Sequence, residues 1–265
     1  MLESFLIKPF AALMLISCSC SLLGVFVLWK KLSYFGDSLS HSILLGLLLG
    51  TIFGFNQIIA LVLFAIIFAF LVGLNLQNKY FSKDTIIAIS SYFCVALAIV
   101  LNDILVKNFN FIAYIFGDIL TVGDQEIQVL TIIVVTTIMF VIFAFNKILL
   151  ININRDLAKI SKINCELWNF LFLILLAITI ALSVRIVGIF LMTALLILPA
   201  AIARVFSISA KQMMAFSLLI SLIVSSFSFY VANSYNLTIS AIVIVFLCMI
   251  FMFSLMIKKF IHHGL

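Results

Sequence analysis

Residues 32–46 read LSYFGDSLSHSILLG, a short polar passage within an otherwise apolar sequence. Asp37 and His41 stand four positions apart, so on a helix their side chains share one face about one turn apart. Small residues recur at the same four-residue spacing, at Ser38, Ser42, Gly46, Gly50 and Gly54. Such a small-residue ridge lets membrane helices pack backbone to backbone. The stretch therefore predicts a closely packed transmembrane helix that carries a polar pair.

The composition of the whole chain places this helix in a membrane protein. The 265 residues are 66% hydrophobic and only 9% charged, and the mean hydropathy is +1.42, whereas soluble domains average about 25% charged residues. The apolar runs are too long for barrel strands and lack their alternation, so the spans must be helices. We expect an all-α polytopic membrane protein that forms a single transmembrane domain over residues 1–265. The net charge of +6 reflects membrane topology, and we expect no nucleic-acid partner.

Charged and turn residues divide the chain into about nine apolar segments, most of them near the ~20 residues that a bilayer requires. They cover residues 9–29, 33–55, 57–78, 84–101, 126–146, 167–184, 186–203, 211–233 and 237–257. Only Arg185 separates the sixth segment from the seventh, so eight spans are an alternative. The aromatic stretch 102–123 predicts a re-entrant or interfacial helix at the outer surface, which would serve as an aromatic belt or as a lid.

The distribution of lysine and arginine orients these segments. With the N-terminus outside, only Lys8, Lys107 and Arg185 of the 15 basic residues fall on the outer side. The cytoplasmic connections then carry the other basic residues, which are Lys30, Lys31, Lys79, Lys83, Lys147, Arg155, Lys159, Lys162, Arg204, Lys211, Lys258 and Lys259. We therefore expect a multi-pass protein of the cell inner (plasma) membrane, with its N-terminus outside and its C-terminus in the cytoplasm.

Two further features are candidates for function. The longest cytoplasmic connection, residues 147–166, contains a short amphipathic helix that Asn154 or Asn152 would cap, and this helix would lie on the bilayer or dock a soluble partner. Pro199 lies inside a span, where it should kink or end the helix. A packed kink and a hinge or wall of a pathway are both compatible with Pro199.

The position of the polar pair in its helix indicates how deep it lies in the membrane and what it could bind. If Ser33 caps its helix, His41 lies ~12 Å along the axis of a span that crosses a ~30 Å hydrocarbon core. Ionisable groups at that depth are costly and usually face a partner or a water-filled path. A histidine and a carboxylate at this spacing can bind a divalent metal such as Zn²⁺, although a structural hydrogen bond with Asp37 as the helix cap and a proton relay are alternatives. Zinc takes about four ligands, so we hypothesise that a two-fold dimer about the small-residue ridge brings two pairs together.

No motif for ATP binding or covalent catalysis occurs in the chain. The sequence contains neither a G-x-x-x-x-G-K-[ST] loop nor an H-E-x-x-H arrangement. We expect no enzymatic activity and no tightly bound cofactor, and any ATP that powers this protein must be bound by another chain.

Four segments, in order along the chain, resemble signature segments of the metal-ion ABC transporter permeases, the membrane subunits of zinc and manganese importers. They are residues 29–42, 113–120, 156–158 and 187–204, and the similarity extends from about residue 5 to residue 257. The zinc-importer type is the most similar. The resemblance implies a permease that works as a homodimer with two cytoplasmic ATPase subunits, and an extracytoplasmic metal-binding protein that delivers the ion.

The resemblance also assigns roles to residues. Asp37 and His41 are expected to face a translocation path along the dimer interface, for zinc first and manganese or iron second. The residues expected to dock into the ATPase are Arg155, Asp156, Leu157 and Ala158. Two departures from the family pattern are residues 159–162, which lack a glycine, and residues 90–94, which lack a histidine. A stand-alone secondary transporter or channel is the alternative, and it would need charged residues in several spans.

Overall fold

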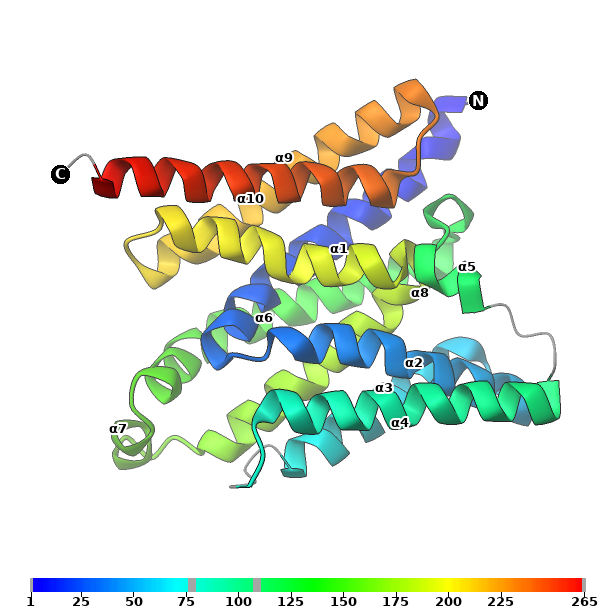
Figure 1. Cartoon of the computed structure of the whole chain (residues 1–265), viewed down its shortest axis with the longest axis horizontal. Helices are drawn as coiled ribbons and strands as arrows, with labels where there is room; N and C mark the ends of the chain where they lie inside the picture. Colours follow the sequence, from blue (N-terminus) through cyan, green and yellow to red (C-terminus); the bar gives the residue numbers. More distant parts are fainter. Residues whose placement is uncertain (1, 76–79, 107–110, 264–265) are drawn as a thin grey trace.

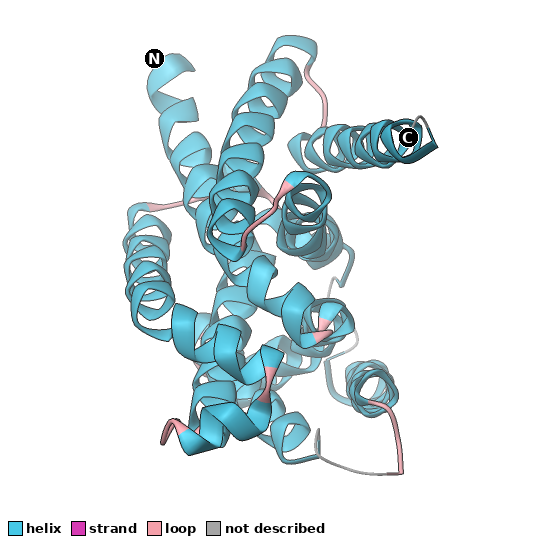
Figure 2. Ribbon diagram, turned by 90° about the vertical axis from the view of Figure 1, so that its left-hand side faces the viewer, coloured by secondary structure: helices cyan, strands magenta, loops and turns pink. Residues whose placement is uncertain are grey.

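The structure is a computed structural model that describes residues 2–75, 80–106 and 111–263. Within these ranges every regular element is a helix, and Figure 2 shows helices joined by short loops. The predicted all-α class is confirmed. The predicted end of the third segment at Asn78, and the basic residues Lys79 and Lys107, lie outside the described residues.

Eight helices of the described residues are long and apolar enough to cross a membrane. They are α1 (Leu2–Lys30), α2 (Ser33–Phe53), α3 (Gln57–Asn75), α4 (Lys83–Leu101), α6 (Asp124–Ile153), α8 (Cys165–Phe206), α9 (Ala210–Tyr235) and α10 (Ile239–His263). The shorter elements are the π-helix η1 (Asn102–Val106), α5 (Phe111–Phe116), the 3₁₀-helix η2 (Ile119–Thr121) and α7 (Arg155–Ile160).

Helix α8 is a hairpin of two spans. Its 42 residues are about twice the number that a bilayer requires, and the backbone leaves the helical conformation at Gly188, where φ is 81° and ψ is 169°. Figure 1 shows that the parts before and after this point run in opposite directions. They correspond to the predicted sixth and seventh segments, so the described residues contain the nine predicted spans. The boundary was predicted wrongly at Arg185, which lies inside the helix, because glycine tolerates the turn conformation and arginine does not.

Pro199 does not end its helix. Helix α8 continues to Phe206, and Gly188 is the residue within it whose backbone is non-helical. Proline costs the helix one N–H donor and fits a helical φ. Pro199 is also buried, and inside a bundle the neighbouring helices can compensate for the backbone bond that a proline removes.

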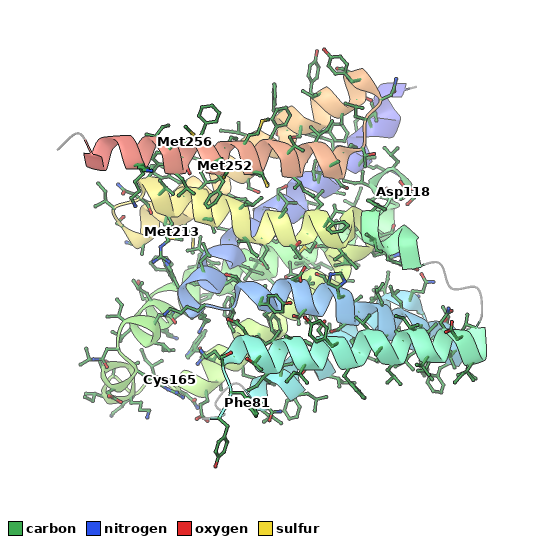
Figure 3. The ribbon with its side chains drawn as sticks, viewed as in Figure 1. Phe81, Asp118, Cys165, Met213, Met252 and Met256 are labelled. Atoms are coloured by element: carbon green, nitrogen blue, oxygen red, sulfur yellow. The ribbon has the colours of Figure 1, made fainter. Side chains whose placement is uncertain are left out.

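The two ends of the bundle carry different elements. Figure 1 places the N-terminus and α5 at one end, and α7 and the C-terminus at the other. Figure 3 shows the same separation through Asp118 and Cys165, which lie at opposite ends of the bundle. We call these the α5 end and the α7 end.

Helices α1, α2 and α8 form the centre of the bundle. In the most apolar 18 residues of these three helices, 72%, 72% and 67% of the residues are buried. The corresponding shares are 22% for α4 and 17% for α10. Serines connect α1 to α9, since the hydroxyl groups of Ser17 and Ser225 are 2.7 Å apart and Ser221 donates to the Ser17 carbonyl at 3.1 Å. Such hydrogen bonds hold helices together where no hydrophobic force acts between them.

The small-residue ridge of α2 is filled by helices of its own chain. A Cβ atom at Gly46 would lie 2.6 Å from Cβ of Phe64 in α3, and the Ser91 hydroxyl of α4 donates to the Ser38 carbonyl at 3.0 Å. Gly54 instead ends the helix in the left-handed conformation, with φ at 68°. The hypothesis that the ridge forms a two-fold interface is therefore wrong, because α3 and α4 already occupy it.

Candidate functional site

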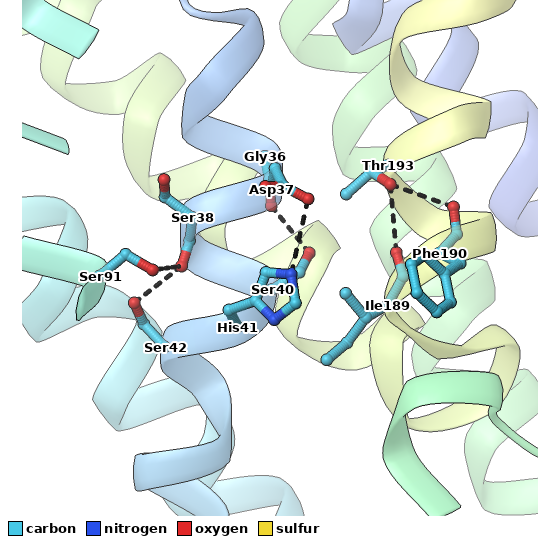
Figure 4. A network of polar contacts seen from close by, with 10 residues as sticks. All are labelled: Gly36, Asp37, Ser38, Ser40, His41, Ser42, Ser91, Ile189, Phe190 and Thr193. Carbon is cyan, nitrogen blue, oxygen red and sulfur yellow. Dashed lines mark hydrogen bonds and ion pairs between the residues drawn. The ribbon is translucent and has the colours of Figure 1, made fainter. Parts of the chain in front are cut away.

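Asp37 and His41 lie together on an uncovered face of α2. Asp37 Oδ1 and His41 Nε2 are 3.7 Å apart, and the two side chains are 42% and 40% exposed. Figure 4 shows them side by side across one helical turn. The exposed Tyr34 precedes them by one turn on the same helix. The pair is thus partly exposed at the surface of a single chain. We call the side of α2 that carries Tyr34, Asp37 and His41 the open face.

Asp37 is not the cap of this helix. The helix begins at Ser33 with Leu32 at the capping position, and no side chain caps it. Both the predicted cap at Ser33 and the alternative cap at Asp37 are therefore wrong. A separation of 3.7 Å is also longer than a hydrogen bond to an imidazole nitrogen. The carboxylate keeps its acceptor capacity for another partner.

Serine hydroxyls of α2 donate within their own helix, and the Ser91 hydroxyl of α4 donates to the Ser38 carbonyl. Ser40 donates to the Gly36 carbonyl and Ser42 to the Ser38 carbonyl, both at 2.7 Å. A Cβ atom at Gly36 would lie 2.6 Å from Cδ2 of Leu196, so α2 and α8 approach closely there. With these faces committed to α3, α4 and α8, the Asp37 side remains the open one.

The part of α8 that follows Gly188 forms one side of this face. Figure 4 shows Ile189, Phe190 and Thr193 across from the Asp37–His41 pair. The Thr193 hydroxyl donates to the Ile189 and Phe190 carbonyls, at 3.3 Å and 3.0 Å. Phe190 is 52% exposed and packs at 6.1 Å, between ring centroids, on Phe116 of α5. The polar pair is therefore flanked by aromatic rings toward the α5 end.

One chain does not supply a complete metal site. In the part of the chain that the structure describes, no group of three or more His, Cys, Asp and Glu side chains is placed to hold an ion. Asp37 and His41 offer an oxygen and a nitrogen, which suit Zn²⁺, but zinc is usually held by about four ligands. Any further ligands of the ion must come from water, from a small molecule bound to the ion, or from a second copy of the chain.

The segment predicted to dock a partner contains α7. Its first residues, 147–153, belong to α6, and Asn154 rather than Asn152 is the cap, because its side-chain oxygen accepts from the Asp156 and Leu157 amides at 2.9 Å and 3.2 Å. Ala158 is fully buried against α6 and α8, whereas Leu157 and Ile160 are 50% and 77% exposed. The two large apolar side chains of α7, Leu157 and Ile160, are thus left open to an external partner.

A glycine interlock at the α5 end escaped the sequence analysis. Gly117 and Gly188 both have positive φ, 67° and 81°, and a Cβ atom on Gly117 would lie 2.3 Å from the Gly188 nitrogen. The Ser240 hydroxyl of α10 bridges this contact by donating to the Val187 carbonyl at 3.2 Å and the Phe116 carbonyl at 3.4 Å. The glycines themselves were the available signal, since each lies within one of the four segments that resemble the family.

An ion pair near the same end was also missed. Arg185 of α8 and Glu126 of α6 approach to 3.5 Å and are 33% and 22% exposed. Glu126 Oε2 also accepts from the Gly123 amide at 2.8 Å. A lone arginine in an apolar run needs a partner, and that rule would have directed attention to the acid at the start of α6.

Comparison with known proteins agrees with these observations. The sequence matches the model of the ABC 3 transport family over residues 3–258. It is 36% identical over 205 residues to the high-affinity zinc uptake system membrane protein ZnuB of Haemophilus influenzae, covering 76% of this chain and 77% of that protein. It is 26% identical over 231 residues to the manganese import system permease protein ScaB of Streptococcus parasanguinis, covering 87% and 82%. The fold is similar to that of PsaBC from Streptococcus pneumoniae in complex with Fab, with a TM-score of 0.82 and 24% identity over 94% of this chain and 90% of that one.

Proposed function

The chain belongs to the ABC 3 transport family, and we propose that it is the membrane permease subunit of an ATP-driven importer of a divalent metal ion. The observation that supports a metal ion as the cargo is the Asp37–His41 pair. Its two side chains are of the kinds that bind metals, and they lie together on the open face of a transmembrane helix. Zinc is the proposed cargo, with manganese or iron second. The nitrogen and oxygen donors suit zinc, and the identity to the zinc permease is higher than that to the manganese permease.

The open face fits a path shared by two copies of the chain. Two Asp37–His41 pairs facing each other would supply four protein donors, the number that a zinc ion commonly takes. The contact would form at the face between α2 and the second part of α8, and not through the small-residue ridge. Ligands along a path must bind weakly enough to release the ion, so a pair that is incomplete in one copy suits transport.

The remaining subunits would attach at the two ends of the bundle. The α7 end carries Lys30, Lys83 and Arg155, which by the positive-inside rule supports a cytoplasmic position for this end. There the exposed Leu157 and Ile160 would dock one of two ATPase subunits. A metal-binding protein would deliver the ion at the α5 end. ATP binding and hydrolysis on the partner chains would then alternate the access of the path between the two sides.

Uptake of radioactive zinc by cells tests this proposal. We expect uptake to require a co-expressed ATPase subunit, and to be lost in Asp37→Asn and in His41→Ala while both variants still insert in the membrane. Asp84→Asn, which removes a carboxylate at the start of α4, is the matched control and should transport normally. Undiminished uptake without any ATPase would favour a stand-alone secondary transporter, and normal uptake in both pair variants would remove the metal role of the pair.

A further inference from the structure

A cavity of about 920 Å³ opens at the α7 end of the bundle, away from the Asp37–His41 pair. It lies where the ends of α1, α3 and α6 meet the starts of α4, α7 and α8 (Figure 1). Its size falls in the range of small-molecule sites, which is about 300–1,000 Å³. We propose that this cavity binds the headgroup and upper acyl chains of an anionic phospholipid from the cytoplasmic leaflet.

The charge of the cavity wall is strongly positive. Lys30, Lys31, Lys83 and Arg155 line it, and Glu166 is the acid that lines it among the described residues. Glu166 approaches Arg155 at 3.9 Å, so it is already paired on the rim. No carboxylate of the described ranges forms an ion pair with any of the three lysines. The wall therefore carries an excess of cations suited to an anion.

Two of the lysines have features of their own in this wall. The Lys30 ammonium group donates to the Asn169 side-chain oxygen and lies 5.4 Å from the centroid of the Phe172 ring. Lys31 has a φ of 55°, a left-handed conformation that glycine or asparagine usually takes after a helix. A lysine at such a position costs some stability, which is consistent with a role for its charge.

Apart from Asn152 and Asn169, the rest of the wall is largely apolar, which points to a lipid rather than a free anion. Phe70, Leu74, Leu167 and Phe170 line the cavity, are between 36% and 64% exposed, and come from the ends of two apolar helices. A soluble phosphate would leave these side chains in contact with water, whereas acyl chains would cover them. Basic pockets between transmembrane helices at the cytoplasmic side are known to bind anionic lipid headgroups. The combination of cations and apolar walls at the membrane surface fits the two halves of a phospholipid.

A tryptophan in the wall provides the reporter for a test. The chain has two tryptophans, and Trp29 lines the cavity whereas Trp168 packs on Lys147 and Phe140. In the full-length chain carrying Trp168→Phe, reconstituted in nanodiscs, Trp29 fluorescence is quenched by lipids brominated on their acyl chains. We expect brominated phosphatidylglycerol to quench Trp29 at about tenfold lower mole fraction than brominated phosphatidylcholine, since basic residues near the membrane surface attract anionic lipids.

Two double variants make the test specific. Lys31→Gln with Lys83→Gln should remove the preference for phosphatidylglycerol. Lys211→Gln with Lys258→Gln removes the same number of exposed charges at the α7 end but outside the cavity, and should leave the preference intact. Equal quenching by the two lipids in the parent protein would overturn the proposal, as would a preference that survives loss of Lys31 and Lys83. Loss of the preference on adding about 10 mM inorganic phosphate would assign the cavity to a free anion and overturn the lipid assignment.

Discussion

At the scale of single residues, several polar groups inside the bundle have a defined partner. Ser17 and Ser225 share a hydrogen bond across two helices, and Arg185 lies next to Glu126. Asp37 and His41 differ, because each side chain remains about two-fifths exposed and their 3.7 Å separation is longer than a hydrogen bond. A histidine and a carboxylate in an apolar segment are costly unless something else contacts them. We therefore propose that a second copy of the chain supplies the neighbour of the open face.

The first prediction concerns Gly24, where α1 touches the backbone of α8. A Cβ atom at this position would lie 1.9 Å from the Leu196 carbonyl oxygen, and no rotamer change can move a backbone atom away. Gly24→Ala should therefore destabilise the protein by about 1–3 kcal/mol, measured as a lower midpoint of thermal unfolding in detergent. Gly73→Ala is the control, because its Cβ would meet Leu173 at an ordinary 3.5 Å and alanine favours a helix. If both variants unfold at the parent midpoint, α1 and α8 are not in close contact.

At the scale of helices, the turn at Gly188 decides the shape of α8. Without it, 42 helical residues would extend ~63 Å at 1.5 Å per residue, about twice the hydrocarbon thickness. The turn brings the second part of α8 back through the bundle, where Thr193 lies across from the polar pair (Figure 4). One backbone conformation thus sets both the number of spans and one side of the open face.

The second prediction compares two glycines with positive φ. Gly188→Ala should cost about 2–4 kcal/mol, because the strained conformation adds to a contact of 2.4 Å with the Phe116 carbonyl carbon. Gly54→Ala has a similar φ of 68° but nothing within 4 Å, so it should cost only about 1 kcal/mol. Thermal unfolding of the two purified variants measures the difference. Equal midpoints would show that the contact with the α5 segment contributes nothing.

The third prediction concerns the exposed apolar side chains of α7. Leu157→Asp together with Ile160→Asp should abolish copurification of the ATPase subunit, because charges would replace apolar contacts in the interface. Ile208→Asp is the control, since this residue is 96% exposed between α8 and α9 and lies outside α7. Retention of the ATPase by the double variant would exclude α7 as its main docking element.

At the scale of the whole molecule, the sequence predicted the elements better than their contacts. The apolar segments, the polar pair and the cap at Asn154 are visible in single stretches, because hydropathy and capping are local properties. The partner of the small-residue ridge was not predictable, since four-residue spacing gives a packing face without saying which helix fills it. The turn at Gly188 was misplaced by three residues for a related reason. Charge indicated Arg185 as the boundary, yet its partner Glu126 keeps Arg185 within the bundle.

The fourth prediction tests the contact between two copies. In a cysteine-free variant, Phe190→Cys should cross-link two chains through a short bis-maleimide, because Phe190 flanks the open face at 52% exposure. Val245→Cys on α10 is equally exposed, at 53%, and should not cross-link, since it lies on a helix expected to face lipid. Gel electrophoresis of treated membranes separates the products. Cross-linking through Val245 alone would place the dimer interface at α10.

The interlock of Gly117 and Gly188 has a consequence for the order in which the protein is made. The chain emerges from the ribosome N-terminus first, so α5 and Gly117 are synthesised well before the turn that they pack against. Ser240, which bridges the two, comes later still. The spans up to α6 can therefore insert before α5 has the neighbours that it packs against. We expect the α5 segment to reach its final position only after both parts of α8 and the start of α10 have been synthesised.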